Sequence, residues 1–355
     1  MINNKKKILY YQNLKQKKIY QPTLFWSELV KKNTKFLAFK SLNNFRSFKS
    51  TLIGFIPFYS LGSQYKVLSD IKNIGKIIKK KIGNKKIFYK LNDSLVKSVN
   101  GNEKAYSQYR ILCTDDIEPK LSEFKESFIG KPFEQFYFNK SIFSASSLNY
   151  LTGLLFLKKH LKNFNGKVFL EIGGGFGSLG EILYKKFKKI KYINLDLFPQ
   201  NIVCEYYLKK SCKNEVSDHL KFKKTKTIKI KNLNRLSSFL NSDIEKLNGK
   251  IDVFINFISF QEMRIDVVKN YLNHIQRLKP KYILLRNLRE GKQDLASKKL
   301  GAKKAGIAHV EKKIEGKKYI NLLKSKYFLL DRNTEPYGNK TWDGFHSELL
   351  LFKKK

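Results

Sequence analysis

The stretch of this 355-residue chain best suited to chemistry is VFLEIGGGFGSLG, residues 168–180. An apolar run ends at Glu171, and four glycines follow it, namely Gly173, Gly174, Gly175 and Gly177. Glycine adopts positive φ without steric cost and lets a ligand approach bare backbone. In open α/β sheets, ligands bind outside the carboxyl ends of the strands. The pattern predicts a cradle for a nucleotide or nucleoside. The competing interpretation is a tight turn without a ligand, with Glu171 as a solvated strand end.

A second acid narrows the type of ligand. Asp196 ends the apolar run in LDLFP, where its carboxylate would accept hydrogen bonds from both hydroxyls of a ribose. The spacing G-x-G-x-x-G of dinucleotide sites is also satisfied, by Gly175, Gly177 and Gly180. However, Glu171 would repel a pyrophosphate and attract a cation. These residues favour S-adenosylmethionine, which carries a sulfonium, an ammonium and a ribose but no phosphate. The alternative for Asp196 is an Asx turn leading into Pro199.

The elements that must position these residues alternate after residue 165. Short apolar runs, interpreted as strands, alternate with amphipathic helices of 8–15 residues, which predicts parallel βαβ units. The predicted strands are 167–173, 190–197, 224–230, 251–257, 281–287, 327–330 and 347–354. The predicted helices include 178–189, 201–212, a short one at 235–241, and 267–278. The last two strands are expected to form an antiparallel hairpin at one edge of the sheet.

The first part of the chain has a different pattern of apolar and polar residues. Its patterns are mixed and mainly helical, so residues 1–145 are predicted to form an N-terminal helical cap or substrate region. The second domain, residues 146–355, opens with an expected helix over 147–164. Either Ser146 or Ser147 is expected to cap that helix.

The segments FLEIGGGFGSLGEIL, YINLDLFPQN, DVFINFISFQEM and YILLRN together resemble class I S-adenosylmethionine-dependent methyltransferases. They are most similar to a family of sugar O-methyltransferases from bacterial surface-polysaccharide gene clusters, over residues 125–355. The resemblance implies a Rossmann-like sheet, mostly parallel with an antiparallel last strand. It also implies that Glu171 and the glycine backbone hold the methionine end of the cofactor and that Asp196 holds the ribose. Asn256 would border the path of the methyl group, unless it only caps its loop.

Transfer of a methyl group to a sugar hydroxyl needs a base beside the acceptor oxygen. Glu262, just after the fourth strand, and His346, before the last strand, are the candidates. The alternatives are a helix N-terminal acid for Glu262 and a hydrogen-bonded loop histidine for His346. The basic stretch 286–293 would face the phosphates of a nucleotide sugar or lipid-linked glycan, or else lie in solvent. No metal is expected, because no tight group of acids follows the fourth strand; Asp115 and Asp116 lie far away in sequence.

The net charge of +43 bears on the class of partner. It would suit a nucleic acid, but the excess is almost all lysine, with only eight arginines, and it is spread along the chain. We interpret it mainly as compositional drift. An RNA methyltransferase is the second hypothesis, although NFIS at the fourth strand lacks the prolines of N6-adenine enzymes. A non-catalytic binding protein on the same fold is the third. With no signal peptide or membrane span, a cytoplasmic location is expected, and contact with an anionic membrane surface stays open.

Overall fold

The computed structural model describes residues 14, 16–39, 42–47, 104–213, 215–292, 310, 312–334 and 347–355. The chain divides into two compact units. Unit 1 comprises Met1–Leu42 and Phe156–Lys355, and unit 2 comprises Asn43–Leu155. This division places the start of the chain with the sheet, and it crosses from unit 2 to unit 1 ten residues after the predicted boundary at 145/146.

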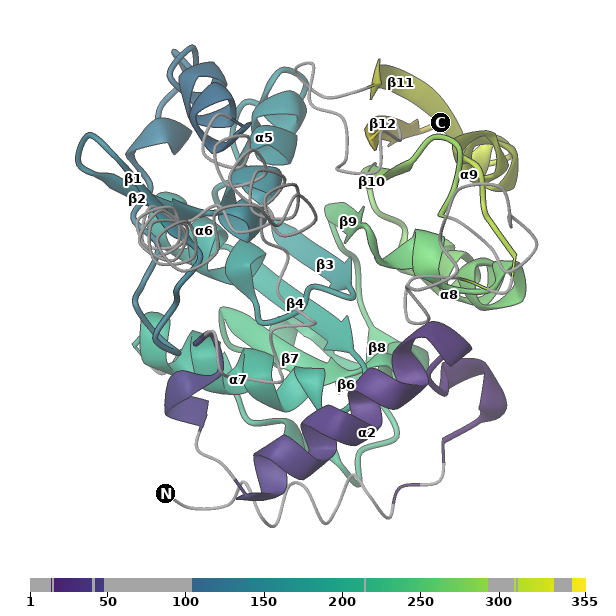
Figure 1. The fold of residues 1–355 in the computed structure, drawn as a ribbon. Helices are drawn as coiled ribbons and strands as arrows, with labels where there is room; N and C mark the ends of the chain where they lie inside the picture. The colour runs from purple at the N-terminus through teal and green to yellow at the C-terminus, as the bar shows by residue number, and fades with distance from the viewer. Residues whose placement is uncertain are drawn as a thin grey trace, which may run out of the picture. The chain divides into compact units, whose positions relative to one another are not determined.

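Unit 1 is built on an eight-stranded sheet with the order β11-β12-β10-β9-β3-β4-β7-β5 (Figure 1). The six strands from β10 to β5 are parallel, whereas β12 runs antiparallel to β10 and to β11. The predicted Rossmann-like sheet with an antiparallel last strand is therefore confirmed. The predicted hairpin is confirmed as well, with β11 outermost and β12 between β11 and the parallel strands.

The sheet forms because its central strands are apolar on both faces, as in α/β proteins generally. Its strands are β3 Val168–Ile172, β4 Lys191–Asp196, β5 Val216–Ser217, β7 Leu236–Leu240, β9 Val253–Phe257, β10 Tyr282–Leu288, β11 Tyr327–Thr334 and β12 Ser347–Lys354. The helices of unit 1 are α2 Leu24–Phe39, α6 Ser178–Lys186, α7 Gln200–Ser211, α8 Ile265–Leu278 and α9 Gly316–Leu323, with the end of α5 Ala145–Lys158. Short 3₁₀ turns connect them: η1 Lys18–Tyr20, η5 His219–Phe222, η6 Ile230–Asn232, η7 Asn241–Glu245 and η8 Ser259–Glu262.

The helices cover both faces of the sheet. Ile193 of β4 belongs to one apolar cluster with Tyr271 of α8 and Tyr319 of α9. The neighbouring residue Tyr192 points to the other face, where its ring lies against Gly180 of α6. Successive side chains of a strand point to opposite faces, so α8 and α9 pack on one side and α6 on the other.

Two predictions for residues 224–241 were wrong. The predicted strand 224–230 contributes only β6 Ile228–Lys229, which pairs with β8 Leu247–Asn248 in a separate two-stranded sheet. The predicted short helix 235–241 is instead β7, a fully buried strand of the main sheet. All five residues of LSSFL are buried in the sheet, which explains why a segment predicted as a short helix forms a strand. Ser238 is accommodated because its hydroxyl donates to the carbonyl of Asn201, 2.9 Å away.

Unit 2 contains a helix over residues 104–112, the turn η4 Leu121–Glu123, the hairpin β1 Gln135–Phe138 and β2 Ser141–Ser144, and most of α5. The start of α5 is capped by reciprocal hydrogen bonds: Ser147 N donates to Ser144 Oγ, and Ser144 N donates to Ser147 Oγ. The N-cap is therefore Ser144, and the prediction of Ser146 or Ser147 as the cap was wrong; Ser147 lies inside the first turn of α5 and completes the reciprocal bonds.

A buried ion cluster lies at the centre of unit 2. The guanidinium of Arg46 donates to Glu126 at 3.0 Å and to Glu134 at 2.7 Å, and all three side chains are at most 3% exposed. The carboxylate of Glu126 also accepts hydrogen bonds from Ser144 and Ser147. The cluster thereby ties residue 46 to the hairpin and to the start of α5.

Residues 16–23, termed here the N-terminal segment, dock along η7 and α8 in unit 1. Tyr20 is 1% exposed and lies in the main apolar cluster, and its hydroxyl contacts Asn270 and His274 of α8. Its carbonyl accepts a hydrogen bond from Asn241 Nδ2 at 2.8 Å. Thr23 Oγ1 then donates to the carbonyl of Glu262, which fixes the start of α2 at η8.

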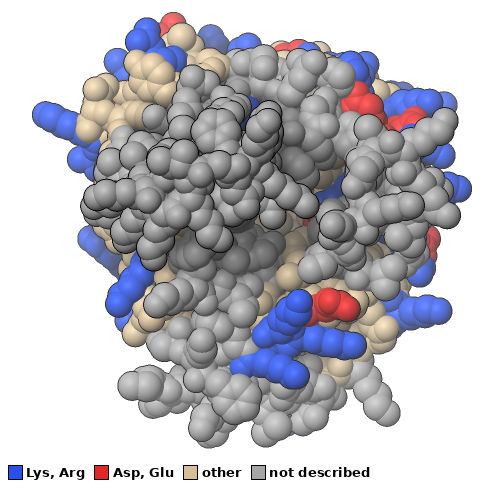
Figure 2. Space-filling model, viewed as in Figure 1, with Lys and Arg blue, Asp and Glu red and all other residues tan. Residues whose placement is uncertain are grey.

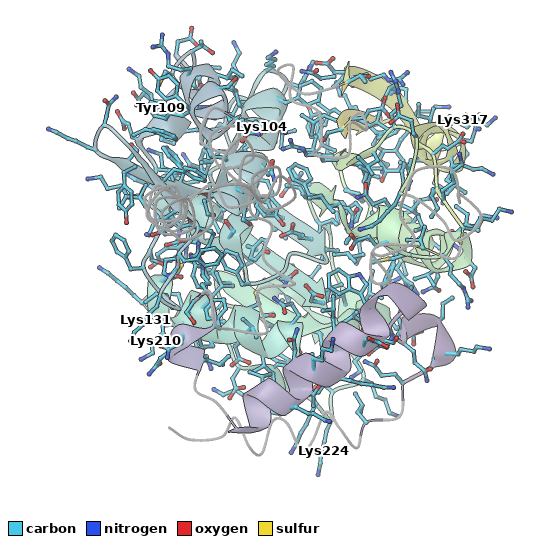
Figure 3. All side chains as sticks on the ribbon, viewed as in Figure 1. Lys104, Tyr109, Lys131, Lys210, Lys224 and Lys317 are labelled. Carbon is cyan, nitrogen blue, oxygen red and sulfur yellow. The ribbon has the colours of Figure 1, made fainter. Side chains whose placement is uncertain are left out.

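Basic side chains are dispersed over the described part of the face seen in Figure 2. Figure 2 shows blue side chains on separate parts of the visible face, with acids among them. The lysines labelled in Figure 3 come from distant parts of the chain, and Lys131, Lys210, Lys224 and Lys317 are exposed. In the described part of the chain, no helix combines the length and apolarity needed to cross a membrane.

Candidate functional site

The glycine-rich turn connects the carboxyl end of β3 to α6. Gly173, Gly175 and Gly177 have φ values of +74°, +62° and +97°, a region that side chains with a Cβ rarely adopt. Gly173 and Gly175 are partly exposed, whereas Gly174 and Gly177 are buried. The backbone of the turn is therefore partly exposed at Gly173 and Gly175, although a Cβ on Gly173 would lie 2.4 Å from Ser259 Oγ. The role of the turn as a ligand cradle stays a prediction.

Glu171 lies in the protein interior beneath this turn, not on the exposed side of the turn. Its side chain is fully buried, and Oε2 accepts a hydrogen bond of 2.6 Å from the hydroxyl of Tyr192. A Cβ on Gly174 would lie 2.3 Å from Glu171 Oε2 and 2.7 Å from Asn194 Oδ1. Glycine is required at position 174 because these two side chains fill the space. Glu171 thus supports the turn from below, and its predicted contact with the methionine end of a ligand stays a prediction.

Asp196 joins the second strand to the same turn. Its Oδ2 accepts a hydrogen bond from Gly175 N at 2.9 Å, and its Oδ1 accepts one from Leu197 N at 2.7 Å. The residue as a whole is partly exposed, while its carboxyl lies largely within the protein. Desolvation by the surrounding protein raises the pKa of Asp196 to about 7, although the two backbone donors oppose the rise. The structure therefore brings together the glycine turn and the acid that the sequence paired.

Asn256 closes the other side of the turn. Its Nδ2 donates to the carbonyl of Ile172 at 2.9 Å and to Ser259 Oγ at 2.6 Å, and its Oδ1 accepts from Phe260 N. Ser259 Oγ in turn donates to the carbonyl of Ile172. The amide of Asn256 thus ties η8 to the end of β3, which is the loop-capping alternative. Its predicted place beside a methyl group stays a prediction.

Ile258, between β9 and η8, has φ +71° and ψ −37°. This conformation is strained for a β-branched residue. The hydrogen bonds of Asn256 on one side and Ser259 on the other hold the strained bend. Such strain is found at sites where a loop must keep an exact position.

Glu262 ends η8 and is 7% exposed. Its Oε1 lies 2.6 Å from Lys292 Nζ. The preceding residue, Gln261, is anchored to the end of β10, because its N–H donates to Asn287 Oδ1 and its Oε1 accepts from Leu288 N. Glu262 is therefore held at the carboxyl edge of the sheet as part of an ion pair. The other candidate base, His346, falls outside the described residues.

The basic stretch 286–293 has partners within the protein. Arg286 donates to Ser347 Oγ, Arg289 pairs with Glu290, and Lys292 pairs with Glu262. Contact with a substrate phosphate, as the sequence predicted, would require Arg289 or Lys292 to exchange its present partner. That contact stays a prediction.

Sequence reasoning missed three residues that support the turn: Tyr192, Asn194 and Ser259. Asn194 Oδ1 accepts from Gly174 N at 3.1 Å, opposite the carboxylate of Glu171. A polar residue inside the apolar run YINLD was the available signal for Asn194. The register of β3 and β4, which pairs Glu171 with Asn194, is what brings the two side chains together.

Comparisons with known proteins add the following. The chain matches no family model and no curated protein sequence. It is similar to the solved structure of magnesium protoporphyrin IX methyltransferase (ChlM) from Synechocystis PCC 6803 with bound S-adenosylhomocysteine. That match has 12% identity and a TM-score of 0.41, and it covers 72% of this chain and 95% of that one.

Two further structures are similar at the same level. The Burkholderia thailandensis 1,6-didemethyltoxoflavin-N1-methyltransferase has 12% identity and a TM-score of 0.39, over 59% of this chain and 79% of that one. The pyocyanin biosynthetic protein PhzM has 11% identity and a TM-score of 0.37. There the match covers 56% of this chain and about half, 53%, of PhzM. Likenesses this distant assign no activity, so the function has to be inferred from the chain's own residues.

Proposed function

We propose that this protein is an S-adenosylmethionine-dependent methyltransferase that acts on the oxygen of a sugar hydroxyl. The observation that supports it best is the hydrogen bond from Gly175 N to Asp196 Oδ2 at the carboxyl edge of the parallel sheet. This hydrogen bond joins the glycine turn to an acidic residue at a partly exposed position. A turn of this kind accommodates the methionine part of the cofactor, and the carboxylate accepts hydrogen bonds from its ribose.

The surroundings of α6 favour this cofactor over a dinucleotide. A pyrophosphate would bind at a helix N-terminus, yet the start of α6 has Glu171 beneath the turn and Glu181 in the first helical turn, both fully buried. The carboxylate of Glu181 contacts the hydroxyl of Tyr207 and Lys185 Nζ. Lys185 thereby offsets the charge of Glu181, whereas the carboxylate of Glu171 beneath the turn would repel a phosphate group and attract a cation.

When bound, the cofactor would supply an activated methyl group. The chain's own residues have three tasks: the partly exposed backbone of Gly173 and Gly175 contacts the ligand, Asp196 orients the ribose, and a base accepts the proton of the acceptor hydroxyl. Glu262 is the proposed base among the described residues, because the bonds of Gln261 and Asn287 hold η8 at this edge. His346 is the second proposed base. The sugar acceptor is supported by the resemblance of the segments around NFISFQEM, and a cytoplasmic nucleotide sugar or glycan intermediate is the proposed form.

The test is incubation of the full chain with S-adenosylmethionine labelled in its methyl group and with separate pools of acceptors. We expect label in nucleotide sugars or surface-glycan extracts, in a form stable to base, as expected for an ether. Label in RNA instead would replace the proposed acceptor by the second hypothesis. Calorimetry with S-adenosylhomocysteine tests the cofactor by itself, and failure to bind would overturn the proposal and favour a non-catalytic role.

A further inference from the structure

The carboxylate of Glu262, the proposed base, is engaged by a cation. Its Oε1 accepts a hydrogen bond from Lys292 Nζ over 2.6 Å. The side chain of Glu262 is 7% exposed and that of Lys292 is 20% exposed, so the pair is largely shielded from water. Shielding makes such a pair stronger than one at an open surface. The ammonium group therefore competes with an acceptor hydroxyl for the lone pairs of Oε1.

The acidic half of the pair is held in place through the backbone of η8. Gln261 N donates to Asn287 Oδ1 at 3.2 Å, and Gln261 Oε1 accepts from Leu288 N at 2.7 Å. The carbonyl of Glu262 itself accepts a hydrogen bond from Thr23 Oγ1 at 3.2 Å. These three bonds fix η8 against the end of β10 and against the N-terminal segment. The carboxylate is therefore the stationary member of the pair.

The turn that carries the lysine is fixed as well, by close backbone contacts. Gly291 has φ +78°, its N–H donates to the carbonyl of Leu288 at 3.1 Å, and a Cβ on it would lie 2.8 Å from the carbonyl oxygen of Ile314. Gly316 N, at the start of α9, donates to the carbonyl of Arg289 at 2.9 Å. The movable part of the pair is thus the lysine side chain, with its flexible four-carbon stem.

The partner that could move this side chain must itself be anionic. A neutral acceptor would separate the two charges without replacing their contact, which is costly for a shielded pair. A lysine ammonium binds phosphate as a point charge, and both proposed forms of the acceptor, a nucleotide sugar and a lipid-linked glycan, carry phosphate. Arg289 is less suited to this role, because it pairs with its neighbour in sequence, Glu290, at a more exposed position.

We propose that a phosphate group of the acceptor takes Lys292 from Glu262, so that the base is released only when a phosphorylated acceptor is bound. This inference rests on the proposed function and names a specificity-determining residue for it. Phosphate oxygens accept hydrogen bonds from Nζ, and Oε1 of Glu262 then accepts a hydrogen bond from the acceptor hydroxyl. Lys292 thereby selects phosphorylated sugars over free sugars.

The first experiment measures binding of inorganic pyrophosphate to the full chain by calorimetry at low salt, without cofactor. Lys292→Met should bind pyrophosphate roughly tenfold or more weakly than the parent chain. Glu262→Gln removes the competing carboxylate and should bind it roughly tenfold or more tightly. The double variant Glu262→Gln/Lys292→Met should lose this gain, because the gain acts through the lysine.

Two variants control for the change in net charge. Glu290→Gln removes an acid from the same turn, and Lys279→Met removes an exposed lysine at the end of α8. Both should bind pyrophosphate nearly as the parent chain does. If Lys292→Met also bound it like the parent, or if Glu290→Gln gained as much as Glu262→Gln, the inference would be wrong. Absence of pyrophosphate binding in both the parent chain and Glu262→Gln would overturn it too.

The second experiment compares methyl transfer to acceptors that differ in phosphate: a free sugar, its 1-phosphate, a nucleotide sugar, and a polyprenyl-diphosphate sugar in detergent. The last two distinguish the sources of the phosphate. The parent chain should show a kcat/KM roughly tenfold or more higher for a phosphorylated acceptor than for the free sugar. Lys292→Met should lose this preference and keep at least the parental turnover of the free sugar.

Equal use of free and phosphorylated sugars by the parent chain would contradict the inference while leaving the proposed function intact. Failure of S-adenosylhomocysteine to bind would instead overturn the proposed function, and with it the release of a base. The pyrophosphate measurements contain no cofactor, so a loss of affinity confined to Lys292→Met would still identify the anion site.

Discussion

At the scale of single residues, Asp196 is the group whose titration should be visible in binding. Its pKa is raised to about 7 by burial, so below that pH the folded protein holds it protonated. A carboxylate accepts hydrogen bonds at both of its oxygens, whereas a protonated carboxyl carries a donor on one oxygen and is a poorer partner for the two ribose hydroxyls. We therefore expect the affinity for S-adenosylhomocysteine to rise as pH increases through about 7, with release of a proton on binding below it.

The measurement is calorimetry across pH 5.5–8.5 in buffers of different ionisation enthalpy, in the parent chain and in Asp196→Asn. The variant should bind more weakly, with no change in affinity across this range. The raised pKa has the opposite effect on the free energy of unfolding. In the unfolded chain an aspartate ionises at about pH 4, whereas Asp196 in the folded protein ionises at about pH 7. The contribution of Asp196 to stability therefore falls as pH rises from about 4 to about 7. Equal affinity of parent and variant would remove Asp196 from the site.

Glu262 gives the second prediction at this scale. Glu262→Gln keeps the size and removes the basic carboxylate. We expect turnover to fall by about 100-fold or more, as for loss of a general base, with the affinity for S-adenosylhomocysteine unchanged. His346→Ala is tested in parallel for the same effect. Glu290→Gln is the matched control, because Glu290 pairs with Arg289 nearby and is given no catalytic role. Turnover at the parental level in Glu262→Gln would exclude this residue as the base.

At the scale of elements, the N-terminal segment is the part whose attachment is most easily tested. Tyr20 is buried against Tyr271, and its hydroxyl contacts Asn270 and His274. Burial lowers the pKa of His274 and raises that of Tyr20 to about 12, so at neutral pH the phenol donates to a neutral ring. We expect Tyr20→Phe to lower the free energy of unfolding by about 1 kcal/mol. Tyr20→Ala should lower it by about 3–5 kcal/mol.

Urea denaturation measures both values. If Tyr20→Ala were as stable as the parent, the segment would not be packed as described. The two variants separate the loss of one hydrogen bond from release of the whole segment.

The elements also show how far the sequence could be interpreted. The strands around Glu171, Asp196 and Asn256 were predictable, because apolar runs bounded by glycine or acidic residues repeat between amphipathic helices. The strand β7 was not, because LSSFL carries serines whose hydroxyl bonds, such as that of Ser238 to Asn201, exist only in the folded sheet. The position of Glu171 beneath the turn depended on its register with Asn194, which no local pattern encodes. The docking of the N-terminal segment was equally hidden, since the partners of Tyr20 and Thr23 are more than 200 residues away.

At the scale of the whole molecule, exposed and buried charges have different effects on stability. Exposed lysines of the described residues, such as Lys131, Lys210 and Lys224, contribute little to stability one by one. In unit 2, by contrast, Arg46 is fully buried between Glu126 and Glu134. Removing the guanidinium of Arg46 would leave the two buried carboxylates without a positively charged partner. We expect Arg46→Met to cost about 3–5 kcal/mol.

Lys17→Met is the matched control for that variant, because Lys17 pairs with Glu245 at a site where the lysine is 69% exposed. It should cost about 0–1 kcal/mol. Denaturation of both variants at low and high salt completes the comparison. Salt should reduce the effect of Lys17→Met and leave that of Arg46→Met nearly unchanged. Similar small costs in the two variants would show that the buried cluster is dispensable.

The placement of β12 between β10 and β11 has a consequence for biosynthesis. A ribosome releases residues 327–334 before residues 347–354, so β11 emerges without the strand that connects it to the remainder of the sheet. Until then both β10 and β11 present open edges, which are templates for pairing with other chains. A nascent chain stalled before residue 347 should therefore be a preferred client of chaperones that shield β-edges.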